Sequence, residues 1–231
     1  MRSITIAALK DPSYEMNESM NVLRTNVSYS GEGVKLVAIT SVSENEGKSV
    51  VAYEMMRNYA NAGFKTLLID ADLRKSTFTA RYNVTADDGH QLTGLADVLS
   101  GKGEINDAVY RTNITNAYVL PIGSYVLNPT PLFSGKLFGA MLDVLKKAFD
   151  FIIIDTPPLG RVIDAAIIAP NCDGAMIVVA ANEVDYRQVN DAKNQLLRVG
   201  ANVLGCVLNK VNAENERYGG KYGKYGSEYR F

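Results

Sequence analysis

The sequence contains few of the residues that build disulfide frameworks or histidine-based metal sites. Among 231 residues there are two cysteines and one histidine. Cys172 and Cys206 lie in apolar stretches, so we expect both to be reduced core residues, which favours a cytosolic compartment. The lone His90 stands in the polar stretch Asp87-Asp88-Gly89-His90, which predicts a solvated loop residue and not a metal ligand.

The chain also lacks an excess of charge of one sign. Its 24 basic and 25 acidic residues leave a formal net charge of −1. No overall field therefore attracts a polyanion or an anionic bilayer. We expect no nucleic acid partner.

Long apolar runs are missing as well. The longest run, Ala175–Ala181, is far shorter than the roughly 18 residues of a membrane span. The start of the chain meets Asp11 after one short apolar patch, which is too little for a secretory signal. If the protein acts at a membrane, we expect a partner to hold it there.

What the sequence does contain is a regular alternation of strand and helix patterns. With 47% hydrophobic residues, the chain suits one large domain. Apolar runs predict strands at 36–39, 66–69, 118–122, 151–154, 175–179 and 203–208. Helical spacing or composition predicts helices at 14–29, 50–62, 94–99, 105–110, 132–149, 163–169 and 186–199. This order predicts an α/β fold, a doubly wound and mainly parallel sheet with helices on both faces.

Two of these helices carry a clear apolar stripe. The N-terminal helix 14–29 reads as amphipathic, with Ser13 as a possible N-cap. The helix 132–149 is predicted from the apolar residues Leu137, Met141, Leu142 and Leu145.

The stretch Lys35–Ser49 reads as a strand that feeds a phosphate-binding loop. It ends in Gly47-Lys48-Ser49, the second half of the pattern G-x-x-x-x-G-K-[ST], in which backbone N–H groups face phosphate oxygens before a helix begins. Val42 stands where the first glycine would be. Asn45 stands where another glycine would ease left-handed dihedrals. The alternative is an ordinary strand-turn-helix with an exposed lysine.

Carboxylates follow two other predicted strands. Asp70 and Asp72 end the second strand, with Arg74 close behind as a possible counter-charge, and Asp155 ends the strand at 151–154. Ligands bind outside the carboxyl ends of the strands in doubly wound sheets. With the loop at Lys48, these residues supply what phosphoryl transfer needs, namely phosphate donors, Mg²⁺ ligands and a spare carboxylate as base. The alternative for each aspartate is a turn that ends its strand.

Two positions in the sequence distinguish between classes of nucleotide-binding protein. Chromosome-partitioning ATPases carry a second lysine five residues before the invariant one, and here that position is Ser43. A GTPase would read guanine with Asn-Lys-x-Asp, whereas this chain has Asn209-Lys210-Val211-Asn212. ATP is therefore favoured over GTP.

The last stretch differs from the rest of the chain. Residues 218–229 read YGGKYGKYGSEY and contain no aliphatic residue. Such a segment cannot bury enough apolar surface to fold. We therefore predict a domain over 1–212 and a disordered, tyrosine-rich tail over 213–231.

Together these motifs resemble the bacterial tyrosine kinases. Asp70-Ala71-Asp72-Leu73-Arg74 is similar to the family's Walker A′ motif, Asp155-Thr156-Pro157-Pro158 to its Walker B motif, and the tail to its C-terminal tyrosine cluster. The resemblance implies a P-loop NTPase fold and a cytoplasmic protein-tyrosine kinase that uses ATP and Mg²⁺ in capsular or exopolysaccharide synthesis.

The resemblance also implies roles for individual residues. The catalytic residues would be Lys48, Asp70 and Asp72, and the Mg²⁺ ligands Ser49, Asp72 and Asp155. The nucleotide-binding residues would be Ser43, Glu44, Asn45, Glu46, Gly47, Lys48, Ser49, Val50 and Asn209, the last at the adenine. The phosphate acceptors would be Tyr218, Tyr222, Tyr225 and Tyr229.

The partners that the resemblance implies are proteins. They are a separate transmembrane activator, which acts through its cytoplasmic C-terminal segment and recruits the chain to the inner face of the membrane, other copies of the chain, and a phosphotyrosine phosphatase. Four phosphotyrosines would add roughly six to eight negative charges to the tail. We expect this charge to expel the tail from a carboxylate-rich site.

This chain departs from the family pattern at two motifs. The family's loop is Pro-Gly-Glu-Gly-Lys-[ST], whereas Glu44 and Asn45 replace its proline and first glycine. Because asparagine tolerates the left-handed region, we expect the loop to close on phosphate. In the self-association motif Glu-x-x-Arg-x-x-Arg, Asn21 takes the place of the middle arginine between Glu18 and Arg24.

Two other readings of the sequence remain open. A P-loop ATPase switch would dock on a partner when ATP is bound and would use the tail as an adhesive segment. A catalytically inactive scaffold would bind no nucleotide because of Val42 and Asn45.

Overall fold

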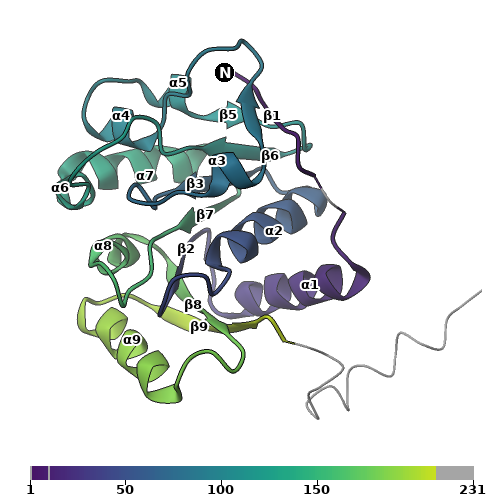
Figure 1. The fold of residues 1–231 in the computed structure, drawn as a ribbon, viewed down its shortest axis with the longest axis vertical. Coiled ribbons are helices and arrows are strands. Elements are labelled where there is room, and N and C mark those ends of the chain that lie inside the picture. The colour runs from purple at the N-terminus through teal and green to yellow at the C-terminus, as the bar shows by residue number, and fades with distance from the viewer. Residues whose placement is uncertain (1, 10, 212–231) are drawn as a thin grey trace, which may run out of the picture.

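A computed structural model describes residues 2–9 and 11–211, and its main element is a seven-stranded sheet (Figure 1). Its strands in spatial order are β5 (Tyr110–Arg111), β6 (Ala117–Leu120), β3 (Thr66–Asp70), β7 (Phe151–Asp155), β2 (Leu36–Ser41), β8 (Gly174–Ala180) and β9 (Val203–Asn209). All neighbouring strands are parallel except β5, which runs antiparallel to β6. The predicted doubly wound, mainly parallel sheet is confirmed.

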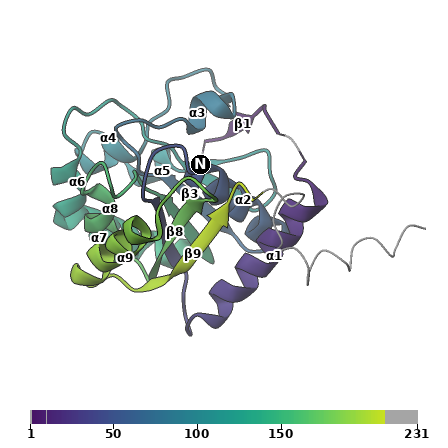
Figure 2. The same ribbon diagram turned by 60° about the horizontal axis from the view of Figure 1, so that its bottom comes forward.

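Helices cover both faces of this sheet, as Figures 1 and 2 show. One face carries α1 (Tyr14–Tyr29), α2 (Lys48–Asn61) and α3 (Phe78–Arg81). The other carries α4 (Leu95–Leu99), α5 (Ile105–Ala108), α6 (Thr130–Ser134), α7 (Lys136–Ala148), α8 (Asp164–Ile168) and α9 (Tyr186–Arg198). Helix α1 begins as predicted, because the Ser13 side chain accepts a hydrogen bond from the Met16 amide.

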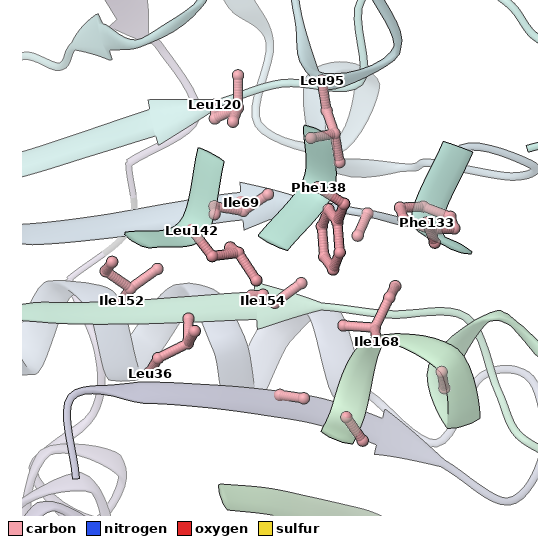
Figure 3. Close-up of a cluster of buried hydrophobic side chains, with 14 of the residues drawn as sticks. Leu36, Ile69, Leu95, Leu120, Phe133, Phe138, Leu142, Ile152, Ile154 and Ile168 are labelled. Carbon is pink, nitrogen blue, oxygen red and sulfur yellow. The ribbon is translucent and has the colours of Figure 1, made fainter. Parts of the chain in front are cut away.

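The two faces form two separate cores because side chains alternate along each central strand. In β7, Ile152 and Ile154 pack under α7, whereas Phe151 and Ile153 face α2. All of β7 is buried, which explains why its sequence is continuously apolar and does not alternate with polar residues. Figure 3 shows the α7 side of this core, where Leu142 lies against β3 and β7.

The predicted helix 132–149 is wrong in its continuity and in part of its face. It consists of α6 and α7, which are separated by Gly135 in an extended conformation. Leu137 is 47% exposed, and Phe138 takes its place in the core. A run with apolar residues at both positions does not say which one faces the sheet, because that depends on the angle at which α7 begins.

Three short strands do not appear among the sequence predictions. β1 (Ile4–Ile6) pairs antiparallel with β4 (Val84–Ala86) beside α3, and the helix predicted at 105–110 ends at Ala108 before β5. Strands of two or three residues carry too little pattern to be recognised.

The expectation for the cysteines is confirmed only in part. Both are free, and Cys172 is half-buried. Cys206 is exposed, because β9 is an edge strand.

None of the helices in the described part of the chain is both long and apolar enough to cross a membrane. The predicted disordered tail lies outside the described residues.

Candidate active site

The phosphate-binding loop connects β2 to α2 and contains two residues in the left-handed region. Asn45 has φ 64°, as expected for a residue that tolerates this conformation, and Gly47 has φ 89°. Val42, at the position of the missing first glycine, is buried, and its carbonyl accepts a hydrogen bond from the Gly160 amide. Since Val42 is not among the described residues with positive φ, this position does not require glycine.

Glu46 and Asn209 hold the loop to the neighbouring strands. The Glu46 carboxylate is buried and accepts hydrogen bonds from the backbone amides of Ser43 and Ala180. Asn209, at the end of β9, donates from Nδ2 to the Glu46 carbonyl at 2.9 Å. A Cβ atom on Gly47 would lie only 2.0 Å from that Nδ2. The backbone of Gly47 and the side chain of Asn209 therefore share one tightly filled space.

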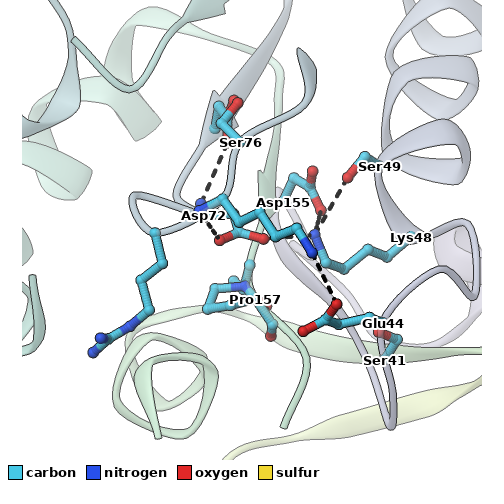
Figure 4. Close-up of polar contacts among 12 residues, drawn as sticks. Ser41, Glu44, Lys48, Ser49, Asp72, Ser76, Asp155 and Pro157 are labelled. Carbon is cyan, nitrogen blue, oxygen red and sulfur yellow. Dashed lines mark hydrogen bonds and ion pairs between the residues drawn. The ribbon is translucent and has the colours of Figure 1, made fainter. Parts of the chain in front are cut away.

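The side chain of Lys48 lies at the centre of the site (Figure 4). Its Nζ is 3.1 Å from Asp72 Oδ2, 3.4 Å from Asp155 Oδ1 and 3.3 Å from Ser49 Oγ. Burial alone would lower the pKa of Lys48, but Asp155 and Asp72 raise it above its ordinary value. The lysine is therefore a cation that neutralises the two carboxylates.

These residues meet because three adjacent strands end at the same edge of the sheet. β7 lies between β3 and β2, and Asp70 pairs in register with Asp155. The loop at Lys48 follows β2, so it joins the two aspartates at this edge. The sequence prediction that the three motifs converge is borne out by this geometry.

Asp70 has different partners from Asp72. It is 2% exposed, and its Oδ2 accepts a hydrogen bond from the Ser76 hydroxyl. Burial raises the pKa of the Asp70 carboxyl to about 7, and the negative charge of Asp155 adds to the shift. Burial also raises the pKa of Asp155, against the effect of Lys48. A pKa of about 7 lets the Asp70 carboxyl exchange a proton near neutral pH.

Arg74 was expected from the sequence to be the counter-charge for the aspartates, but in the structure Lys48 has this position. Arg74 Nε lies 2.7 Å from Oδ2 of Asp164, a residue that is 1% exposed at the start of α8. Thr130, the first residue of α6, donates to Asp164 Oδ1 at 2.7 Å and accepts from Arg74 at 2.9 Å. The loop after β3 is therefore fixed to α6 and α8 by one buried carboxylate.

Oxygen ligands for a metal ion are present, although in a small number. Ser49, Asp72 and Asp155 surround the Lys48 amine and offer a hydroxyl and two carboxylates. Within the described residues, no group of three or more His, Cys, Asp or Glu side chains could hold a metal ion. This set fits Mg²⁺ bound together with a phosphorylated ligand, because Mg²⁺ keeps several waters and takes few protein carboxylates.

Some residues of this site carry no signal in the sequence. Thr130 and Asp164 contact Arg74 across the fold, whereas Ser76 contacts Asp70 six residues away. None of the three belongs to a recognisable motif. Of the residues predicted from the sequence, Ser43 to Val50 form the loop and the start of α2. Asn209 lies beside them. The four tyrosines Tyr218, Tyr222, Tyr225 and Tyr229 lie outside the described residues.

Comparison with known proteins places this site in its class. The AAA domain family matches residues 34–199. The MinD protein of Pyrococcus horikoshii, in a complex with Mg-ADP, aligns with a TM-score of 0.63 at 25% identity, over 75% of this chain and 69% of that one. The fold and the loop define a P-loop nucleoside triphosphatase.

Other similarities identify the family within this class. Tyrosine-protein kinase CpsD of Streptococcus agalactiae is 43% identical over 213 residues, which are 92% of this chain and 91% of that protein. The chimeric protein CapA2B2 aligns with a TM-score of 0.80 at 29% identity, over 90% and 92% of the two chains. This chain belongs to the bacterial tyrosine kinase family, and it is a protein-tyrosine kinase.

Proposed function

We propose that the protein transfers the γ-phosphoryl group of ATP to the tyrosines of its own C-terminal cluster, in trans, and to other proteins. The observation that carries this proposal is the cluster of Lys48, Ser49, Asp72 and Asp155 at the end of the phosphate-binding loop. Such a cluster combines a phosphate-binding cation with Mg²⁺ ligands, which is what phosphoryl transfer requires.

Each side chain has a chemical task in this proposal. Lys48 binds the β- and γ-phosphates of the substrate, and Ser49, Asp72 and Asp155 hold Mg²⁺. When bound, Mg²⁺ neutralises phosphate charge and orients the leaving group. Asn209 contacts the adenine in this proposal, from its position at the end of β9 beside the phosphate-binding loop.

Asp70 acts as the base in this scheme. It accepts the proton of the acceptor tyrosine while the tyrosine oxygen forms its bond to phosphorus and the bond from phosphorus to the ADP oxygen breaks. A base is most effective when its pKa lies near the working pH, and burial raises the pKa of Asp70 to about 7. The hydrogen bond from Ser76 holds this carboxylate in one orientation.

The biological setting is proposed from the relatives. We infer that the chain regulates capsular or exopolysaccharide synthesis from the cytoplasm. A separate transmembrane activator recruits it to the inner face of the membrane, and a phosphotyrosine phosphatase reverses its modification. Self-association brings the tail of one copy to the site of another.

The test is incubation with MgATP and the cytoplasmic segment of the activator, followed by phosphotyrosine mass spectrometry and an assay of free phosphate. The wild type should gain phosphotyrosine at Tyr218, Tyr222, Tyr225 and Tyr229. Lys48→Met should gain none, and a variant with all four tyrosines changed to phenylalanine should lose the label on itself. Lys147→Met provides a control, because Lys147 is exposed on α7.

Each competing reading predicts a different result. A P-loop ATPase switch would release free phosphate without forming phosphotyrosine. An inactive scaffold would show no nucleotide-induced rise in melting temperature. Equal labelling of the wild type and Lys48→Met would contradict the assignment of this site.

A further inference from the structure

Two exposed cations converge on one carboxylate at the mouth of the active site. Lys75 Nζ is 3.0 Å from Glu44 Oε2, and Arg161 Nε is 3.6 Å from Glu44 Oε1. The side chains of Lys75 and Arg161 are 71% and 69% exposed, and that of Glu44 is 38% exposed. The three residues come from the loops after β3, β7 and β2, next to the aspartates that end β3 and β7 and to the lysine that begins α2.

The other two cations of these loops are already engaged. Lys48 is largely buried between Asp72 and Asp155, and Arg74 is bound to the buried Asp164. Lys75 and Arg161 face solvent instead, and the partner they share is a flexible glutamate. Exposed ion pairs of this kind are weak and screened by salt, so another anion can replace the glutamate.

Glu44 is also a departure of this sequence from its family. The family pattern has a proline at this position, which has no charged group, whereas this chain places a carboxylate there. A negative charge beside a phosphate-binding loop opposes the binding of phosphate. The positive charges of Lys75 and Arg161 compensate for this negative charge. The hydrogen bond from Lys75 also holds the pKa of Glu44 below its ordinary value.

We propose that Lys75 and Arg161 dock an acidic residue of the acceptor segment beside its tyrosine, and that Glu44 occupies this docking site when no acceptor is bound. The proposal rests on the phosphorylation of the tail tyrosines proposed above. An acceptor must enter at this edge of the sheet to reach the carboxylates, and the two cations lie on loops at that entrance. The occupant is an acidic peptide because both docking groups are cations and their present partner is a carboxylate.

The tail of this chain offers a matched pair of acceptors. Tyr229 follows Glu228 directly, whereas Tyr222 follows Lys221 and has no acidic residue within three positions. An acidic docking rule therefore favours Tyr229 over Tyr222. The ratio of their initial phosphorylation rates reports docking independently of overall activity.

The experiment uses one copy as the enzyme and another as the acceptor. The enzyme has its four tail tyrosines changed to phenylalanine, and the acceptor carries Lys48→Met with an intact tail. Site-resolved mass spectrometry then gives the Tyr229 to Tyr222 ratio. In the enzyme, Lys75→Ala with Arg161→Ala should lower this ratio about two- to fivefold, the effect of losing one or two exposed ion pairs.

A matched control removes the same charges at the opposite edge of the sheet. Lys147→Ala with Arg198→Ala changes one exposed lysine and one exposed arginine in the last turns of α7 and α9. It should leave the ratio unchanged. Glu44→Gln should raise the ratio, because it frees the two cations.

The acceptor side completes a double-mutant cycle. Glu228→Gln in the acceptor should lower the ratio with the wild-type loops and have no effect with the Lys75→Ala/Arg161→Ala enzyme. The inference is overturned if the ratio does not respond to the loop variants, or if these variants raise KM for ATP and not for the acceptor. A wild type that gains no phosphotyrosine on its tail would overturn the proposed phosphorylation of the tail and, with it, this inference.

Discussion

Gly47 is the residue of the site at which the smallest substitution should have a large effect. Its φ of 89° is unfavourable for any residue with a Cβ atom, and Asn209 fills the space that a Cβ atom would need. Other glycines of the chain, such as Gly63, share the first constraint but not the second. Two separable physical effects therefore act on one residue.

We predict that Gly47→Ala lowers the free energy of unfolding by more than the roughly 1–2 kcal/mol that positive φ alone costs. Gly63→Ala is the control, because Gly63 has φ 93° and nothing within 4 Å of its added Cβ. Urea unfolding measures the free energy of unfolding of both glycine variants. Asn209→Ala should partly rescue Gly47→Ala, and equal losses for the two glycine variants would show that the contact with Asn209 is unimportant.

A second prediction at the residue scale concerns Asp164. Asp164→Asn keeps the shape but removes the charge that pairs with Arg74, so we expect a loss of about 1–3 kcal/mol of unfolding free energy. Thr130→Val removes only hydrogen bonds of the same cluster and should cost about 0.5–1.5 kcal/mol. Thermal or urea unfolding should show a larger loss of stability for Asp164→Asn than for Thr130→Val. The reverse order would show that the ion pair contributes less than the threonine.

At the scale of elements, Asp173 anchors the start of β2 to the helix layer. Its Oδ2 accepts hydrogen bonds from the amides of Lys35 and Leu36 at 2.9 and 2.8 Å, and Oδ1 pairs with Lys146 of α7. Burial disfavours its charge, but Lys146 and the two amides together hold the pKa of Asp173 below its ordinary value. The start of the strand that leads to the phosphate-binding loop is thus fixed by a carboxylate.

This arrangement predicts a pH dependence of stability. Because the pKa of Asp173 is lower in the folded state, its contribution is fully present above about pH 4, the unfolded value, and is lost as the pH falls through the folded value. Asp173→Asn should cost about 1–2 kcal/mol at neutral pH and progressively less in acid. Urea unfolding at several pH values tests this, with Asp143→Asn on the exposed side of α7 as the charge-matched control. A cost that is independent of pH would contradict the assignment.

At the scale of the whole molecule, the site joins loops from three strands. β2, β7 and β3 are adjacent, and the residues that follow them meet around Lys48. A ligand that binds all three loops stabilises the sheet as a unit, since it binds the folded state and not the unfolded chain.

We therefore predict that MgATP at about 100 times its Kd stabilises the protein by about 2.7 kcal/mol, which raises the melting temperature by roughly 5–10 °C for a chain of this size. Removing Mg²⁺ with a chelator should remove part of this shift. Ser49→Ala should lower the Mg²⁺-dependent part and leave the melting temperature without ligand nearly unchanged. If the Ser49→Ala protein shows the full Mg²⁺-dependent rise in melting temperature, this hydroxyl is excluded as a Mg²⁺ ligand.

Much of this architecture could be predicted from the sequence. The continuous apolar run of β7 indicated a strand buried on both faces, and the order of strands and helices indicated the parallel sheet. Parallel strands expose their carboxyl ends at one edge, so the meeting of Lys48, Asp70 and Asp155 could be predicted before any distance was known. Local patterns sufficed here because burial and chain direction are encoded in neighbouring residues.

Other features depend on residues far apart in the sequence, and they become visible only in the folded chain. The sequence placed Arg74 beside the aspartates, whereas the fold pairs it with Asp164. It did not indicate that Glu44 meets Lys75 and Arg161, or that α7 buries Phe138 and exposes Leu137. Local sequence patterns were sufficient to predict the class of fold and the edge of the sheet at which the chemistry lies. Which charges pair at that edge follows only from the three-dimensional structure, because folding brings together side chains that are far apart in the sequence.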